Sequence, residues 1–143
     1  MLTKEILRVK GSALYTVAPH ARLAEALDSM VENDIGSLVV MDHGRLAGML
    51  TFREVLRALR GGVSAADTQV ADVMVAEPAV VGPDMEVDDL RRLMLDTKVR
   101  YVPVMDGSTL AGVLSFHDVA RAVLEEQSFE NRMLKGYIKN WPE

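Results

Sequence analysis

The sequence contains no cysteine and none of the short motifs that identify common enzymes. The first absence excludes disulfides, thiol catalysis and cysteine-ligated zinc sites, although it leaves the redox environment open. We recognise no Walker loop, metal-ligand cluster or nucleophile–base pair, and the three histidines are not spaced as a metal site. We therefore expect a protein that is not an enzyme and has no catalytic cofactor or metal.

Long apolar runs and excess positive charge are also missing. The apolar runs are far too short to span a bilayer, and residues 1–11 lack the features of a signal peptide. The 16 basic residues face 21 acidic ones, and a net charge of −5 argues against affinity for nucleic acid or an anionic membrane. We expect a cytoplasmic protein with neither partner. Its 143 residues suffice for one compact domain with a real core.

The sequence contains an internal repeat of one unit. Residues 15–59 align with residues 79–123 without a gap, and 14 of the 45 pairs are identical. Eleven of these pairs lie from position 40 onward, where MDHGRLAGML corresponds to MDGSTLAGVL. A register held over this length indicates internal duplication. Two copies are too few for a solenoid and suit a pseudo-symmetric pair that shares one core.

Each copy predicts the order strand, helix, strand, strand, helix. A short strand, 16–19 or 80–83, ends at a proline, and apolar residues at helical spacing follow it. The short apolar segments 37–41 and 101–105 predict buried strands, and turn-forming residues at 42–45 and 106–109 make each the start of a hairpin. The closing helix begins after Thr51 or Ser115. The fold class is α+β.

The segments outside the two copies differ from each other. We divide the chain into an N-terminal helix leading into repeat one (1–14), repeat one (15–60), a linker with a short helix near 70–74 (61–78), repeat two (79–124) and a C-terminal helical extension and tail (125–143). The last helix is expected to run to Gly136. On it Phe129, Met133 and Tyr137 form a stripe. We interpret this stripe as cover for the protein's own core, with a subunit interface as the alternative.

The turn before each closing helix admits two interpretations. Thr51-x-x-Glu54 and Ser115-x-x-Asp118 match capping boxes, which are worth about 1 kcal/mol each. The N-terminus of a helix also attracts phosphate, a hydroxyl there can donate to it, and a carboxylate one turn later can accept both hydroxyls of a ribose. Gly48 and Gly112 leave room for a close backbone approach. The motif alone does not choose between a cap and a nucleotide site.

The whole pattern resembles a pair of CBS (cystathionine beta-synthase) domains. The segments that carry the resemblance are TVAP and VVGP, IGSLVVMDHGRLAGMLTFREV, and VRYVPVMDGSTLAGVLSFHDV, and it covers about residues 3 to 125. It is nearest to small stand-alone bacterial proteins that contain little beyond one CBS pair. The resemblance implies two β-α-β-β-α repeats related by a pseudo-twofold axis, each with a small three-stranded sheet. It also implies a flat, disc-like homodimer.

The resemblance further implies two clefts for adenosine-containing ligands such as AMP, ADP, ATP, NAD(H) or S-adenosylmethionine. In each cleft one repeat holds ribose and phosphate while the other surrounds the adenine. The better cleft combines Ser115, His117, Asp118 and Arg100 on the phosphate and ribose side with Ala18, Ile35, Gly36 and Ser37 around the base. The weaker cleft combines Thr51, Arg53 and Glu54 with Val81, Gly82, Val99 and Tyr101. Glu54 stands where the family usually has Asp, which puts ribose binding there in doubt.

Several of these residues have simpler interpretations. His117 is equally well an exposed helix residue, Arg100 the partner of a surface carboxylate, and Tyr101 a core or interface residue. We expect a regulatory module that senses an adenine nucleotide and modulates an unidentified protein. The alternative is a ligand-free dimerisation scaffold whose corners are only helix caps.

Overall fold

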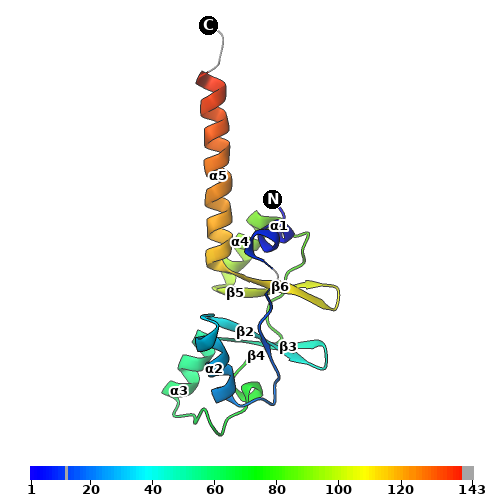
Figure 1. Cartoon of the computed structure of the whole chain (residues 1–143), viewed down its shortest axis with the longest axis vertical. Helices are drawn as coiled ribbons and strands as arrows, with labels where there is room; N and C mark the ends of the chain where they lie inside the picture. The colour runs from blue at the N-terminus through cyan, green and yellow to red at the C-terminus, as the bar shows by residue number, and fades with distance from the viewer. Residues whose placement is uncertain (12, 140–143) are drawn as a thin grey trace.

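The computed structural model describes residues 1–11 and 13–139. The elements of the first half are α1 (Thr3–Lys10), β1 (Thr16–Val17), α2 (Leu23–Glu32), β2 (Ser37–Asp42), β3 (Arg45–Thr51) and α3 (Phe52–Arg60). Those of the second half are a 3-10 turn (Val70–Asp72), β4 (Val75–Ala76), α4 (Val87–Thr97), β5 (Tyr101–Asp106), β6 (Thr109–Ser115) and α5 (Phe116–Lys139). Figure 1 shows the two repeats stacked along the long axis, with α5 rising from the second.

The two hairpins confirm the predicted repeat. Ser37 pairs with Thr51 in β2–β3, and Tyr101 pairs with Ser115 in β5–β6. Both ladders shift register at the same place, after Val40 and after its equivalent Val104. Each closing helix starts directly after its hairpin, as the sequence predicts. The α+β class and the paired small sheets are therefore confirmed.

The prediction of three strands in each sheet is wrong in detail. The first sheet has four strands in the order β1-β2-β3-β4, because Val75–Ala76 of the expected linker pairs with β3. The second has two strands, and Val81 adds a single parallel bridge to Val104. In the first repeat the Val39 amide donates to the Tyr15 carbonyl at 3.2 Å. Its equivalent in the second repeat is Pro103, which has no N–H to donate, so the first strand cannot extend there.

Each repeat packs against a short segment that stands, in the sequence, directly before the other repeat. Helix α1 comes before the first repeat but packs on the second, where Ile6 is 6% exposed and belongs to the core. The amides of Thr3 and Lys4 donate to carbonyls of Met85 and Pro83, both at 2.9 Å. The 3-10 turn comes before the second repeat but packs on the first, whose core contains Val70. The two repeats are therefore tied together by exchanged segments.

The two hairpin glycines make room for these exchanged segments. A Cβ on Gly112 would stand 2.6 Å from Leu7 Cδ2 of α1. A Cβ on Gly48 would stand 2.6 Å from the Val75 carbonyl oxygen and 2.7 Å from Met74 Sδ. At such distances a side chain would force its neighbours to move, and the Val75 backbone is less free to do so than the end of the Leu7 side chain. The close approach that the sequence indicated is therefore made by the protein's own chain.

Helix α5 is longer than predicted and leaves the body of the molecule. It passes through Gly136 and reaches Lys139, and in Figure 1 its C-terminal part stands clear of both repeats. Phe129 is 58% exposed and Met133 is 62% exposed. The interpretation of this stripe as cover for the protein's own core is therefore wrong for these two residues. The side chain of Tyr137 lies outside the described part of the structure.

Candidate functional site

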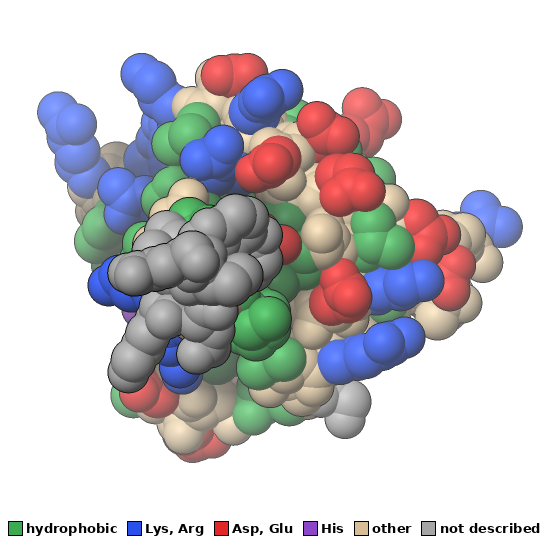
Figure 2. Space-filling model, turned by 90° about the horizontal axis from the view of Figure 1, so that it is seen from above, with side chains coloured by type: hydrophobic (Ala, Val, Ile, Leu, Met, Phe, Trp, Pro, Cys, Tyr) green, Lys and Arg blue, Asp and Glu red, His purple; other side chains and the backbone are tan. Residues whose placement is uncertain are grey.

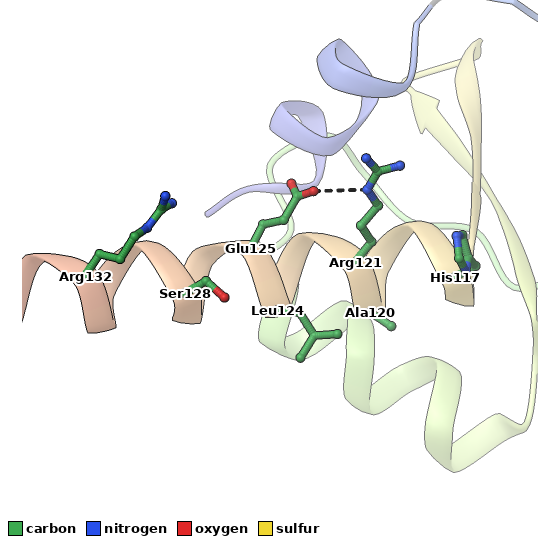
Figure 3. A pocket seen from close by; sticks show the side chains of 7 residues that line it. All are labelled: His117, Ala120, Arg121, Leu124, Glu125, Ser128 and Arg132. Carbon is green, nitrogen blue, oxygen red and sulfur yellow. Dashed lines mark hydrogen bonds and ion pairs between the residues drawn. The ribbon is translucent and has the colours of Figure 1, made fainter.

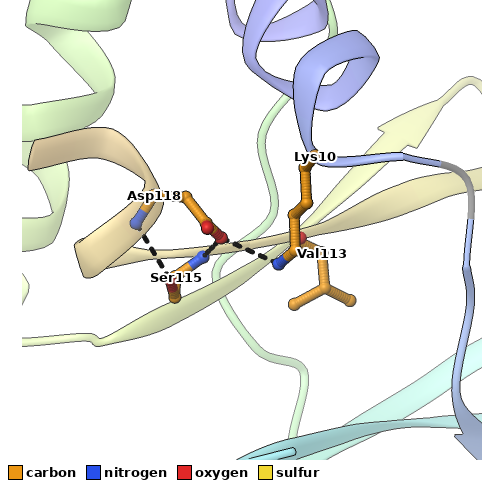
Figure 4. Close-up of polar contacts among 4 residues, drawn as sticks. All are labelled: Lys10, Val113, Ser115 and Asp118. Carbon is orange, nitrogen blue, oxygen red and sulfur yellow. Dashed lines mark hydrogen bonds and ion pairs between the residues drawn. The ribbon is translucent and has the colours of Figure 1, made fainter. Parts of the chain in front are cut away.

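The corner between β6 and α5 is built around Ser115 and Asp118. The Asp118 amide donates to Ser115 Oγ at 3.0 Å, and the Ser115 amide donates to Asp118 Oδ2 at 2.8 Å (Figure 4). This reciprocal pair is the predicted capping box, which satisfies two backbone N–H groups at the start of the helix. The strand fixes Ser115, and the first turn of the helix places Asp118 over it.

Lys10 reaches this corner from the end of α1. Its Nζ donates to Asp118 Oδ2 and to the Val113 carbonyl, each at 2.7 Å (Figure 4). Partial burial alone would raise the pKa of Asp118, but hydrogen bonds from Lys10 and Ser115 outweigh it and hold this pKa below its ordinary value. The corner therefore holds an ionised carboxylate beside an ammonium group.

This arrangement predicts how stability depends on pH. Since the pKa of Asp118 is lowered by folding, its ionised form stabilises the protein at neutral pH. That contribution is complete above the pKa of an unfolded aspartate and is lost as the pH falls through the folded pKa. Between about pH 5 and pH 2, the free energy of unfolding should therefore fall more steeply in wild type than in Asp118→Asn. Denaturant unfolding at a series of pH values measures both, and parallel curves would contradict the assignment.

Thr51 and Glu54 form the equivalent corner before α3, with a different use of polar atoms. Glu54 is 8% exposed, and its Oε1 accepts hydrogen bonds from the Thr51 amide at 2.9 Å and the Thr51 hydroxyl at 2.7 Å. Thr51 Oγ1 also accepts from the Arg53 amide at 3.2 Å. The hydroxyl proton of this corner and Glu54 Oε1 are thus both engaged within the cap.

The Ser115 corner keeps a hydroxyl donor that the Thr51 corner uses within its cap. Ser115 Oγ accepts from the Asp118 amide, and within the described residues its own proton has no acceptor. Among the described residues, the hydrogen bonds that the Asp118 carboxylate accepts all go to Oδ2. One hydroxyl donor and one carboxylate oxygen are therefore available to a ligand at this corner.

Gly36, at the entry to β2, is covered by a side chain of the other repeat. A Cβ on Gly36 would collide with the Tyr101 hydroxyl and would stand 3.1 Å from Phe52 Cε2. Tyr101 lies opposite Ser115 in the β5–β6 ladder, so its ring links the Ser115 corner to Gly36. The resemblance implies an adenine at Gly36 and assigns Tyr101 to the other cleft. In the structure the phenol of Tyr101 itself lies against Gly36.

Two basic residues of the predicted phosphate side are available to solvent. Arg100 and His117 are exposed, and neither forms an ion pair with any residue that the structure describes. The Arg100 carbonyl accepts from the Phe116 amide at 2.7 Å, which places its backbone at the corner. The alternative that Arg100 pairs with a surface carboxylate is not observed in the described residues.

The remaining predicted residues vary in accessibility. Val81 is 4% exposed and packs in the second core, so its side chain is not available to a base. Arg53 and Gly82 are exposed. Ser37 pairs with Thr51, its backbone neighbour in the ladder. The partly buried members of the two predicted base environments are Ala18, Ile35, Gly36, Ser37, Val99 and Tyr101.

A hollow of about 390 Å³ extends along α5 from His117 to Arg132. Figure 3 shows that α5 supplies its whole lining, which consists of His117, Ala120, Arg121, Leu124, Glu125, Ser128 and Arg132. Arg121 and Glu125 form an ion pair in it at 3.0 Å. Because one helix lines it, this hollow is a surface groove and not a cleft between the repeats.

Lys10 is the site residue that sequence reasoning missed. It lies outside both copies of the repeat, and 108 positions separate it from Asp118. The sequence offers one hint: residues 3–11 stand before the first copy as residues 70–74 stand before the second. This correspondence does not show that each segment packs on the other repeat. In the part of the chain that the structure describes, no three acidic or histidine side chains group as a metal site. No helix there is long and apolar enough to cross a membrane.

Comparison with known proteins agrees with this architecture. The sequence profile of the CBS domain matches residues 5–61 and again residues 70–125. A mitochondrial CBS domain-containing protein of Arabidopsis thaliana is 36% identical over 121 residues, which make up 80% of this chain and 59% of that protein. The chain thus spans less than two thirds of the length of this relative.

Solved structures show the same fold. A CBS-domain containing protein from Agrobacterium tumefaciens superimposes with a TM-score of 0.80 at 30% identity, covering 85% of this chain and 98% of that one. A CBS domain pair solved in complex with 5-methylthioadenosine and S-adenosyl-L-methionine superimposes with a TM-score of 0.78, covering 88% of this chain and 98% of that one. Its identity of 23% supports likeness of fold alone. The chain belongs to the CBS domain family, and its two repeats form a CBS domain pair.

Proposed function

We propose that this CBS domain pair is a regulatory module that binds one adenosine-containing ligand, such as AMP, ADP, ATP, NAD(H) or S-adenosylmethionine, at the Ser115 corner. The observation that carries the proposal is the capacity left at this corner. Ser115 keeps a hydroxyl donor, Asp118 keeps a carboxylate oxygen, and Lys10 supplies a positive charge 2.7 Å from that carboxylate. A related fold has been solved with adenosine-containing ligands.

The phosphate and ribose side follows from the chemistry of these groups. The Ser115 hydroxyl donates to a phosphate oxygen, which the helix dipole favours. The Phe116 and Asp118 amides of the first turn already donate to the Arg100 carbonyl and to Ser115 Oγ. Asp118 accepts from the ribose hydroxyls and so selects a nucleoside over free phosphate. Lys10 of α1, Arg100 directly before β5 and His117 of α5 are proposed to offset the negative charge of the ligand.

The base side is formed by the other repeat. Ala18, Ile35, Gly36 and Ser37 are the residues that we assign to it. A base that lies against Gly36 displaces the phenol of Tyr101, which covers that glycine in the structure. Binding therefore moves a side chain on β5, and this movement couples the ligand to the position of one repeat relative to the other.

The second cleft, with Thr51, Arg53, Gly82 and Val99, is proposed to stay empty. Glu54 is buried, and its Oε1 accepts from the Thr51 hydroxyl, so a ligand would have to break this hydrogen bond of the cap before it could use that hydroxyl as a donor. Breaking a cap costs about 1 kcal/mol. We therefore expect one ligand for each chain.

Regulation requires that the ligand prefer one of two arrangements of the protein. We propose that the bound and free states differ at α1, because Lys10 connects this helix to the ligand corner. The regulated partner is an unidentified protein, a second copy of the chain is a further partner, and the site of action is the cytoplasm. The module itself is proposed to bind its ligand without chemical change.

Calorimetric titration with AMP, ADP, ATP, NAD, NADH and S-adenosylmethionine tests this proposal. We expect saturable binding of at least one of them at a stoichiometry near one per chain, and none of inorganic phosphate at the same concentration. Chemical conversion of a ligand during the titration would contradict the proposal that the module binds its ligand without chemical change. Absence of heat with all six, together with an unchanged melting temperature, would contradict ligand binding.

The scaffold remains the second candidate, because both corners are complete as helix caps. Each satisfies its own backbone N–H groups without any ligand. If this function is the correct one, Ser115→Ala changes stability alone and no nucleotide changes the melting temperature of the chain.

A further inference from the structure

The two exchanged segments differ in charge at the position of Lys10. Residues 6–10 of α1 correspond to residues 70–74 by the same offset that aligns the two repeats, so Lys10 corresponds to Met74. The first residue of each segment packs in the core of the repeat that receives it, and the correspondence therefore holds in the structure. Among the described residues, the carboxylate of the Thr51 corner forms no ion pair. The Ser115 corner is thus the one that receives a cation from its exchanged segment.

Lys10 occupies part of the carboxylate that a ribose would use. Each carboxylate oxygen has two lone pairs. On Asp118 Oδ2, one of them accepts from the Ser115 amide at 2.8 Å and the other from Lys10 Nζ at 2.7 Å. The Ser115 amide belongs to the cap, so the ammonium group is the occupant that is free to leave. Two neighbouring ribose hydroxyls need both oxygens of the carboxylate, and the second hydroxyl therefore has to displace Lys10.

The Lys10 ammonium group can change its partner while α1 stays docked. The other end of the helix is held by the Thr3 amide and hydroxyl, which donate to the Met85 carbonyl at 2.9 Å and 2.8 Å, and by the buried Ile6. Lys10 lies in the last turn, its side chain is 38% exposed, and a flexible stem of four carbons carries the charge. A movement of this side chain is enough to take the charge away from Asp118, and it also releases the Val113 carbonyl.

The rest of the surface does not attract a phosphate. The chain carries a net charge of −5, and acidic side chains gather on one side of the face seen from the α5 end (Figure 2). A phosphate monoester carries a charge of about −1.5 to −2 at neutral pH, so its binding requires positive charge close to it. Arg100 and His117 are exposed, whereas two hydrogen bonds hold the Lys10 ammonium group at the corner. Lys10 is therefore a cation whose position the fold fixes.

We propose that Lys10 makes the Ser115 corner select adenosine ligands that carry a 5′-phosphate, an inference that rests on the proposed function. In the free chain Lys10 competes with the ribose for Asp118. In the complex its ammonium group pairs with the phosphate and leaves Oδ2 of Asp118 to the ribose. Adenosine has to displace Lys10 without offering it a new partner. S-adenosylmethionine has a positive sulfonium group in place of the phosphate, which disfavours it further.

Calorimetric titration of the full chain with AMP and with adenosine tests this selection. The variant is Lys10→Met, which places the residue of the first repeat's segment at this position. We expect wild type to bind AMP at least tenfold more tightly than adenosine. In Lys10→Met the affinity for adenosine should rise about two- to fivefold, because a partly exposed ion pair no longer has to be broken. The preference for AMP should fall about tenfold, because a charge-assisted contact with phosphate is lost.

Lys4→Met is the matched control. It removes the same charge from the same helix, but Lys4 lies at the other end of α1 and pairs with the exposed carboxylate of Asp84 at 3.1 Å. Both affinities should stay as in wild type. Lys10→Arg keeps a cation at the corner and should keep the preference for AMP. Circular dichroism verifies that each variant is folded at the temperature of the titration.

The ratio of the two affinities separates this role of Lys10 from a structural one. A structural role would lower both affinities alike, and an unchanged ratio in Lys10→Met would overturn the inference while the proposed function stands. Tighter binding of S-adenosylmethionine than of AMP to wild type would do the same. An equal change of the ratio in Lys4→Met would show an effect of net charge and would also overturn it. Absence of binding of all three compounds to wild type would overturn the proposed function and this inference together.

Discussion

Replacing Asp118 by alanine should lower the affinity for the adenosine-containing ligand by about ten- to a hundredfold. Hydrogen bonds to a charged group are worth about 1.5–3 kcal/mol, and each 1.4 kcal/mol is a factor of ten in the dissociation constant. The carboxylate is ionised at neutral pH, because its pKa is held down by Lys10 and Ser115 against the effect of burial. It can therefore accept from ribose without first losing a proton. Calorimetric titration at neutral pH measures the change.

The equivalent residue of the first repeat provides the control. Glu54→Ala also removes a capping carboxylate, and so it costs about 1 kcal/mol or more of stability, as Asp118→Ala does. Glu54 is buried in its cap and plays no part in the proposed site. We expect Glu54→Ala to leave the affinity unchanged at a temperature where both variants are folded. An equal loss of affinity in both variants would show that the effect comes from the caps and not from a ligand contact.

Replacing Ile6 by alanine should destabilise the second repeat, although Ile6 precedes the first. Ile6 is 6% exposed and packs in the core of the second repeat. Replacing a buried isoleucine by alanine costs about 2–5 kcal/mol, because apolar contact is lost and a cavity remains. Hydrogen exchange read by mass spectrometry should show faster exchange in β5 and β6 than in wild type, with a smaller change in β2 and β3.

Val9→Ala is the control on the same helix. Val9 is 85% exposed, so its truncation should change neither the free energy of unfolding nor the exchange of β5 and β6 by a measurable amount. If Ile6→Ala instead accelerates exchange mainly in β2 and β3, the exchange of segments between the repeats is contradicted.

The repeat and its elements could be predicted from the sequence because they depend on local chemistry. Short apolar segments place the strands, turn-forming residues place the hairpins, and the capping residues at Thr51 and Ser115 place the helix starts. Each of these signals acts within a few residues. Internal duplication then supplies an independent check, because both copies give the same order.

The exchange of segments could not be predicted, because it depends on which of two similar cores a helix joins. The apolar face of residues 3–10 would suit either repeat, and nothing local distinguishes them. The position of Lys10 beside Asp118 follows from this exchange and was missed for the same reason. The strand lengths depend on a single missing donor at Pro103, which matters only once its partner strand is known.

The stripe of Phe129 and Met133 was misinterpreted for a related reason. Helical spacing shows that an apolar face exists, but it does not show how far the body of the protein extends along the helix. The helix continues past Gly136, and this part leaves the core. The position of the Tyr101 ring over Gly36 could not be predicted either. A glycine in the sequence leaves room for a ligand or for a neighbouring side chain, and it does not show which of them is present.

The binding of an adenosine-containing ligand at the Ser115 corner is tested most directly by nuclear magnetic resonance. The backbone amides of the ¹⁵N-labelled chain would be followed during titration with AMP and with ATP. The amides of Ser115 and Asp118 donate within the cap, and Gly36 lies under Tyr101. We expect saturable shifts at these three amides and at Lys10, with smaller changes at Thr51 and Glu54. Unchanged spectra at millimolar ligand, or shifts confined to α5, would contradict it.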